Sequence, residues 1–284
     1  MNKKMEVPMK NILVGIDFSK GSIHALEYAI NLANIIHSDI ILLWVDKQLE
    51  PGSIYVDTDQ HNYKEEASQN INEIIEKYAS TLIHGKLYYK LRRGKVYTEM
   101  AVQAKLSKSF LIITGTHGGS GFEEYWIGSN AFRVVTSAPC PVITIRPNYP
   151  IPQQFKHILM SIDTTPETMQ KVPIIIELAK VMESEIFILG LNATNLQSLQ
   201  KKVDDSVRRV EAMLREQKIL STVEIAKNVN ITSAILSCSE RIQADLIAIM
   251  TEHEPSESSL MMGPHAQQII SQSVVPVLSI QSQK

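Results

Sequence analysis

Residues 11–45 read NILVGIDFSKGSIHALEYAINLANIIHSDIILLWV, and residues 157–191 read HILMSIDTTPETMQKVPIIIELAKVMESEIFILGL. The two segments align without a gap at an offset of 146 residues, which pairs Asp17 with Asp163. Residues 111–145 and 246–280 align in the same way at an offset of 135. Self-similarity of this kind indicates an internal repeat. The chain is therefore predicted to hold two copies of one unit, the second shorter by 11 residues around positions 48–61.

Short apolar runs and helical stripes alternate along the first copy. Continuous apolar runs predict strands buried on both faces at residues 11–16, 39–45, 87–91, 110–114 and 142–145. Apolar residues at helical spacing predict helices at residues 20–36, 63–82, 96–106 and 130–137. The second copy repeats the strands near residues 157–162, 186–191, 220–226, 245–250 and 276–280. This alternation predicts right-handed crossovers and, in each copy, a five-stranded parallel sheet with helices on both faces.

The fold class is therefore α/β, with two tandem Rossmann-like domains. We predict domains at residues 1–147 and 153–284, joined by a stiff, Pro-rich linker at 148–152. Ser19 is placed to cap the helix that starts at residue 20. Pro173 falls inside the corresponding helix of the second copy, where a proline should kink the helix or delay its start.

Composition argues against several classes of partner. A net charge of −2 leaves no basic surplus for a nucleic-acid backbone. Cys140 and Cys238 are too few for a disulfide framework, and no His/Cys cluster has metal-ligand spacing. Residues 1–9 lack the apolar core of a signal peptide, and the apolar run 40–45 is too short to cross a bilayer. We therefore expect a cytoplasmic protein without a nucleic-acid, membrane or metal partner.

A glycine-rich loop follows the fourth strand of the first copy and reads GTHGGSGFEEYWIGSN over residues 115–130. Gly115, Gly118, Gly128 and Ser129 form the pattern G-x2-G-x9-G-S. Glycines let backbone N–H groups approach an anion, and Gly128-Ser129 opens a helix whose positive end favours phosphate. Asp17, after the first strand, is placed to accept from a ribose hydroxyl or a base amine. The loop alone is equally compatible with plain turn chemistry.

The VGID segment at 14–17, this loop and the ending SAPCPVITIRP at 137–147 resemble the universal stress protein family. The resemblance covers nearly the whole chain, twice, and implies an adenine nucleotide alpha hydrolase-like fold. It implies an adenine-nucleotide-binding regulator that acts through its first domain, with ATP or another adenine nucleotide as ligand, with or without Mg²⁺. The site residues that it implies are Asp17, Val45 (by its backbone, to adenine), Gly115, His117, Gly118, Gly128, Ser129 and Asn130.

The resemblance also implies an intramolecular pseudo-dimer. Single-copy relatives pair through their last strands, so residues 142–145 and 277–280 are expected to lie close together. Covering these two edges prevents open-ended strand pairing. A homodimer of the whole chain is compatible with the same pattern.

The chain departs from the family pattern at several positions. Glu123 and Glu124 stand in the loop and would repel a triphosphate, which favours AMP or ADP over ATP. In the second copy Met250, His253 and Pro264 replace Gly115, Gly118 and Ser129. Because these replacements add side chains and remove an N–H, the second copy is predicted not to bind ATP in the same manner. His253 and His265 are interpreted as surface loop residues rather than metal ligands.

Two other functions remain open on the sequence. The chain could be a scaffold or interaction module of the stress response, without nucleotide, which suits the second copy better than the first. An adenylate-forming or pyrophosphatase-type enzyme would need a phosphate loop directly after the first strand, and residues 17–21, DFSKG, are not one. His117 is the only general-base candidate, so little or no catalysis is expected.

Overall fold

The computed structural model describes residues 10–46, 60–116, 127–251 and 262–282. The first half contains β1 (Asn11–Gly15), α1 (Lys20–Ile36), β2 (Asp39–Asp46), α2 (Gln60–Tyr78), β3 (Leu87–Arg93), α3 (Val96–Ser107), β4 (Leu111–Gly115), α4 (Ser129–Ser137) and β5 (Val142–Ile145). The second half contains β6 (His157–Ile162), the 3-10 helix η1 (Pro166–Lys171), α5 (Val172–Met182), β7 (Glu185–Asn192), α6 (Gln197–Glu216), β8 (Ser221–Lys227), α7 (Ile231–Arg241), β9 (Leu246–Thr251), α8 (Pro264–Gln272) and β10 (Val277–Gln281).

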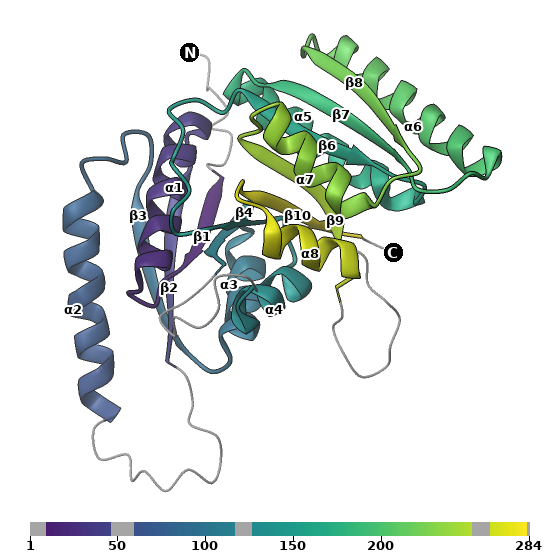
Figure 1. The fold of residues 1–284 in the computed structure, drawn as a ribbon. Helices are drawn as coiled ribbons and strands as arrows, with labels where there is room; N and C mark the ends of the chain where they lie inside the picture. Colours follow the sequence, from purple (N-terminus) through teal and green to yellow (C-terminus); the bar gives the residue numbers. More distant parts are fainter. Residues whose placement is uncertain (1–9, 47–59, 117–126, 252–261, 283–284) are drawn as a thin grey trace, which may run out of the picture.

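The strands form one sheet in the order β3-β2-β1-β4-β5-β10-β9-β6-β7-β8 (Figure 1). Neighbouring strands within each half are parallel, which confirms the predicted α/β fold with two repeated units. The halves meet through an antiparallel pairing of β5 with β10, in which Leu278 lies opposite Ile143. The expected proximity of residues 142–145 and 277–280 is therefore confirmed, and it merges the two sheets into one.

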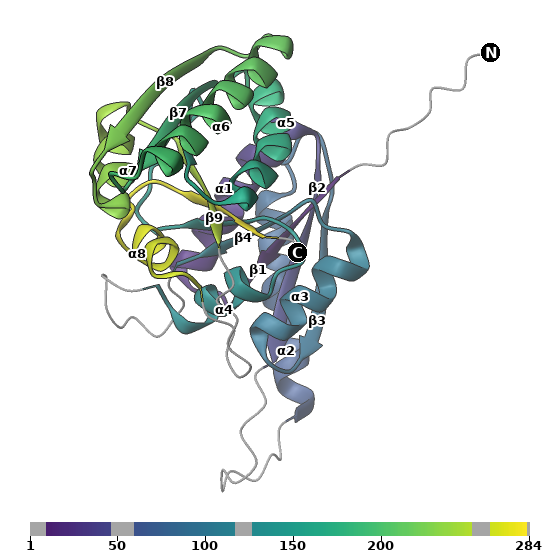
Figure 2. The same cartoon turned by 90° about the vertical axis from the view of Figure 1, so that its right-hand side faces the viewer.

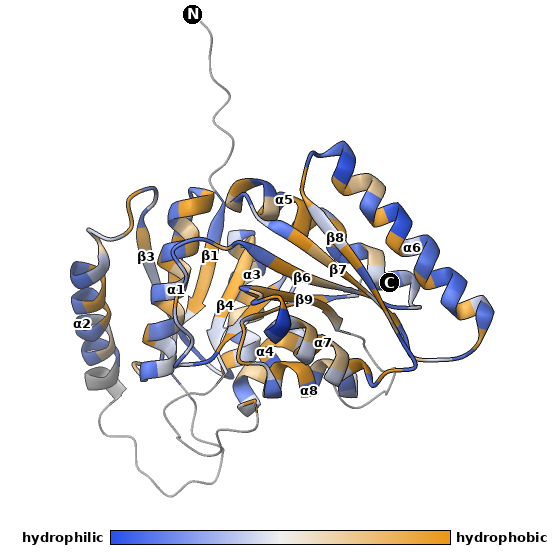
Figure 3. Cartoon of the chain, turned by 45° about the horizontal axis from the view of Figure 1, so that its top comes forward, coloured by the Kyte–Doolittle hydropathy of each residue, from blue (hydrophilic) through white to orange (hydrophobic). Residues whose placement is uncertain are grey.

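Helices cover both faces of this sheet, and each face has its own apolar core. One core joins strand residues to α1, α2, α5 and α6, and the other joins them to α3, α4, α7 and α8. The alternation of strand side chains explains the split: Ile12 and Val14 of β1 point into the first core and Leu13 into the second. Figure 3 shows the apolar strands between helices that carry many hydrophilic residues, most clearly α2 and α6.

Several contacts hold the two halves against each other. The rings of Tyr28 on α1 and Phe155 meet edge to face with centroids 5.5 Å apart. Asn31 on α1 donates to the carbonyl oxygen of Pro152 at 2.6 Å, and His24 Nε2 lies 2.7 Å from that of Tyr149. The connecting segment is therefore packed along α1. On the opposite face, α4 and α8 lie side by side (Figure 2).

Local signals explain most of the element boundaries. Ser19 caps α1 by accepting from the N–H of Ser22, as predicted. Pro173 lies in the first turn of α5, which begins only at Val172, because a proline is tolerated there and not in a helix interior. The predicted delay of this helix is confirmed. Most of the other observed element ends lie within one residue of the predicted ends. The ends of α2 and the C-terminal end of β3 lie two to four residues from the predicted positions.

The end of α2 differs from the prediction for a reason that lies outside the helix. The apolar spacing predicted a helix to residue 82, but α2 ends at Tyr78. The side chain of Asn34, on α1, donates to the carbonyl of Thr81 and accepts from the N–H of Ile83. These bonds hold residues 79–83 in a turn against α1, while Leu82 is still buried.

Candidate functional site

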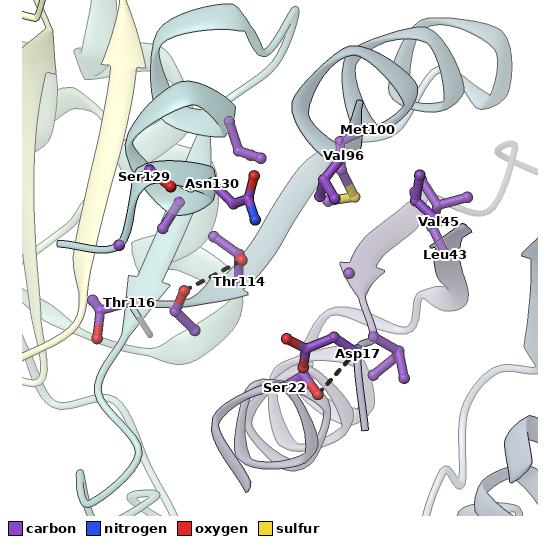
Figure 4. A pocket seen from close by; sticks show the side chains of 16 residues that line it. Asp17, Ser22, Leu43, Val45, Val96, Met100, Thr114, Thr116, Ser129 and Asn130 are labelled. Carbon is purple, nitrogen blue, oxygen red and sulfur yellow. Dashed lines mark hydrogen bonds between the residues drawn. The ribbon is translucent and has the colours of Figure 1, made fainter. Parts of the chain in front are cut away.

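A cavity of about 330 Å³ opens in the first half where β1, β2 and β4 reach their carboxyl ends. Figure 4 shows Asp17 and Ser22 on one side of it and Ser129 and Asn130, from the start of α4, on another. Val45 belongs to the wall formed by β2. Open parallel sheets bind ligands in this position, beyond the carboxyl ends of their strands.

Asp17 is held in a local hydrogen-bonded turn. Its Oδ1 accepts from the backbone N–H of Ser19 at 3.1 Å and from the Ser19 hydroxyl at 2.5 Å. Its own N–H donates to the hydroxyl of Ser22 at 3.3 Å. These bonds fix the carboxylate at the mouth of the cavity, where it is exposed. Asp17 therefore has a structural role at the start of α1 whether or not a ligand is bound.

The N-terminus of α4 forms the polar end of the cavity. Gly128 is its N-cap residue, and no side chain in the described part of the chain caps this helix. The N–H of Gly128 donates to the carbonyl of Thr116 at 2.8 Å, which ties the helix start to the end of β4. The first N–H groups of a helix lack partners within the helix and attract anions. Residues 128–131 present this end to the cavity.

An apolar wall completes the site and was absent from the sequence prediction. Val96 and Met100 of α3 and Leu43 of β2 line the cavity (Figure 4). Val134 of α4 also belongs to this wall. The spacing of Val96 and Met100, four residues apart on one helix face, was the available signal. It was not decisive because the same spacing serves any core-facing helix.

The structure brings together six of the eight predicted residues. The six that line the cavity are Asp17, Val45, Gly115, Gly128, Ser129 and Asn130. His117 and Gly118 lie outside the described residues, as do Glu123 and Glu124, so the predictions that rest on them stay predictions.

The second half has a smaller cavity at the corresponding place. It measures about 160 Å³, and Asp163, Gly263 and Pro264 occupy the positions of Asp17, Gly128 and Ser129. Met250 fills the position of Gly115 and is buried. His265, which we expected in a surface loop, is an exposed residue in the first turn of α8 and lines this cavity. His253 lies outside the described residues.

In the described part of the chain, no group of three or more His, Cys, Asp or Glu side chains is arranged to hold a metal ion. No helix among the same residues combines the length and the apolar character needed to cross a membrane. Cys140 and Cys238 are free thiols, and burial raises the pKa of Cys140 to about 12. A thiol with this pKa stays protonated and unreactive at neutral pH.

Comparison with known proteins places these features in one family. The family model described as universal stress protein matches residues 8–146 and again residues 154–281. A universal stress protein of Methanocaldococcus jannaschii is 26% identical over 145 residues, 48% of this chain and 82% of the relative. Universal stress protein YxiE of Bacillus subtilis is 28% identical over 146 residues, 48% of this chain and 97% of the relative.

A solved structure resembles the whole chain. The crystal structure of a universal stress protein from Archaeoglobus fulgidus has a TM-score of 0.77 and 20% identity, and the match covers 96% of this chain and 97% of that one. At 20% identity this similarity shows the fold alone. The two family matches cover nearly all of the sequence, one per half. The chain therefore belongs to the universal stress protein family, as a tandem of two such units.

Proposed function

We propose that this protein binds an adenine nucleotide in the cavity of its first half and acts as a regulator with little or no catalysis. The observation that carries the proposal is the cavity of about 330 Å³ that joins the Asp17 carboxylate to the N-terminus of α4. Its volume falls at the lower end of the range typical of small-molecule sites. It has an acceptor at one end, anion-binding N–H groups at the other and apolar walls between them.

Each part of the cavity suits one part of a nucleotide. The adenosine would lie against Val45, Val96 and Met100, with the ribose hydroxyls donating to Asp17. The phosphates would lie at the start of α4, near the Ser129 hydroxyl. No acidic cluster supports a tightly held Mg²⁺ in the described residues. The number of phosphates, and with it the choice among ATP, ADP and AMP, depends on loop residues outside the described ranges.

The described lining offers little for catalysis. Asp17 is the only titratable side chain among the described residues that line the cavity, and Ser19 already donates two hydrogen bonds to its Oδ1. Hydrolysis would need a base within hydrogen-bond reach of an attacking water. A regulator that changes state on binding a nucleotide is therefore the better supported role. We also propose a cytoplasmic location, in keeping with the two free cysteines.

Thermal unfolding with added ATP, ADP or AMP tests this proposal. A ligand at about 100 times its Kd adds about 2.7 kcal/mol to stability, which is roughly 4–5 °C in Tm for a chain of this size. If millimolar concentrations of all three nucleotides leave the Tm of the wild type unchanged, the proposal is wrong.

Ser129→Pro tests whether the nucleotide binds at the start of α4. It removes one N–H and one hydroxyl from the phosphate end, yet proline is favoured at the first position of a helix. Gly128 already has the extended ψ of 146° that a following proline requires, as Gly263 has a ψ of 144° before Pro264. We expect the fold to persist and the nucleotide shift to fall by more than half. The matched control Pro264→Ser should leave the shift unchanged, and a full shift in Ser129→Pro would move the site elsewhere.

The main alternative is a scaffold or interaction module. This alternative is supported for the second half only. There, Pro264 removes one of the anion-binding N–H groups at the start of α8. A homodimer of the whole chain also stays a prediction, which light scattering of the purified protein would check.

A further inference from the structure

We propose that the cavity of the second half is a separate ligand site, one that takes an uncharged heterocycle with N–H or O–H donors, such as a nucleobase or nucleoside, and rejects phosphate. The site is lined by the turn after β6, by α7 and by the start of α8. This site belongs to the second half alone and does not need the first cavity to bind a nucleotide.

The acceptor of this cavity is built like that of the first. Asp163 Oδ1 accepts from the backbone N–H of Thr165 at 2.8 Å and from its hydroxyl at 2.5 Å. The N–H of Asp163 donates to the hydroxyl of Thr168 at 3.2 Å. The repeat has thus kept the turn that presents a carboxylate to the ligand, together with the side chains of Thr164 and Thr165 on the lining.

The described part of this cavity offers a phosphate less than the first cavity does. Pro264, the first residue of α8, has no N–H to donate, and Met250 occupies the position of Gly115. No lysine or arginine belongs to the described lining. A phosphate would lose its solvation here and find fewer N–H donors in return than at the start of α4.

A buried lysine beside Asp163 favours an uncharged ligand over a cation. The side chain of Lys171 is fully buried and donates to the carbonyl of Thr168 at 2.9 Å and to its hydroxyl at 3.0 Å. Burial lowers the pKa of Lys171 to about 8, although Asp163 opposes the change. In its charged form Lys171 offsets part of the charge of Asp163, which weakens the attraction for a cation. The missing N–H of Pro264 then remains the main obstacle to a phosphate. Ala25 stands at the corresponding position of the first half, so this lysine is particular to the second.

The size and walls of the cavity set the class of ligand. At about 160 Å³ it has half the volume of the first cavity and lies below the range of about 300–1,000 Å³ typical of drug-sized ligands. The large apolar side chains on its walls are Leu191, Ile231, Ile235, Ile249, Met250 and Ile269. A cavity of this size suits one flat ring system, such as a nucleobase, between the apolar walls. The ring would direct a donor at Asp163, and the sugar of a nucleoside would lie toward the rim near His265.

Two matched alanines allow the cavities to be filled one at a time. Ala131 of α4 lines the first cavity and Ala266 of α8 lines the second, at equivalent positions of the repeat, and they are 5% and 6% exposed. Leucine at either position projects into its own cavity. Isothermal titration of the full chain with adenosine, and separately with AMP, then reports on each site.

We expect Ala131→Leu to keep one equivalent of adenosine and to bind AMP at least about tenfold more weakly than adenosine, a difference of about 1.4 kcal/mol. Adding Ala266→Leu should abolish the remaining adenosine binding. Ile235→Phe on α7 fills the same cavity from another element and should act alike. In the wild-type chain, either change in the second cavity should remove one equivalent of adenosine without changing AMP binding.

Three results would overturn the inference. Adenosine could fail to bind at millimolar concentration to the wild type and to Ala131→Leu. Its binding could survive both Ala266→Leu and Ile235→Phe, or AMP could bind the second cavity as tightly as adenosine does. Failure of the first-half proposal has a different signature. The wild type would then bind no AMP, ADP or ATP, and any adenosine binding would be lost in Ala266→Leu or Ile235→Phe but not in Ala131→Leu.

Discussion

Replacing Lys171 by methionine removes a positive charge that the fold buries completely. Burial lowers the pKa of this ammonium from 10.5 to about 8, although Asp163 opposes the change. Below pH 8 both the folded and the unfolded chain carry the proton, and the folded chain pays about 3 kcal/mol to hold it. Between pH 8 and 10.5 the folded chain releases the proton first, so this destabilisation disappears as the pH rises.

Urea unfolding at pH 7 and pH 10 measures this effect. We expect the wild type to gain about 2–3 kcal/mol relative to Lys171→Met between the two pH values. Burial raises the pKa of Tyr28 and of Tyr149, but these groups titrate in both proteins and cancel in the difference. Lys201→Met, at an exposed position of α6, is the control and should show no such change. A difference between wild type and Lys171→Met that is equal at both pH values would refute a buried ammonium.

Three further changes test the packing of the fold and of the junction between its halves. In Gly85→Ala the new Cβ would lie 2.1 Å from the carbonyl oxygen of Ser38, so urea unfolding should show a loss of about 1–3 kcal/mol, and an unchanged midpoint would contradict that contact. Ser271→Ala removes the hydroxyl that accepts from the buried N–H of Ile127 at 3.3 Å across the two halves. We expect a loss of about 1–3 kcal/mol and a weaker nucleotide shift in thermal unfolding, and an intact shift would show that the first site does not depend on this contact. Phe155→Ala should cost about 3–5 kcal/mol because the ring is fully buried between the halves, and a loss below about 1 kcal/mol in urea would argue against that packing.

Much of the fold was predictable because its signals are local. The buried strands, the helix from residue 20 to 36, the Ser19 cap and the displaced start at Pro173 all follow from residues close in sequence. The end of α2 was not predictable in this way. Its apolar spacing continues to Leu82, and only the side chain of Asn34, 47 residues earlier, holds Thr81 in a turn.

The first candidate site was also predictable only in part. Asp17, Gly128 and Ser129 could be named from the glycine pattern and from the rule that parallel sheets bind ligands at their carboxyl ends. The wall formed by Val96 and Met100 could not be predicted in this way, because apolar residues at helical spacing line a packed core and a cavity equally often.

By itself, the sequence determined that this protein is two copies of one α/β unit and that the copies differ where an anion would touch, at Gly115 against Met250 and Ser129 against Pro264. The tertiary structure alone decided the volumes of the two cavities and the place of Lys171 beside Asp163. The physical reason is that hydrogen-bonding pattern and hydrophobic period are properties of neighbouring residues. Cavity volume and charge compensation are sums over side chains that only packing brings together.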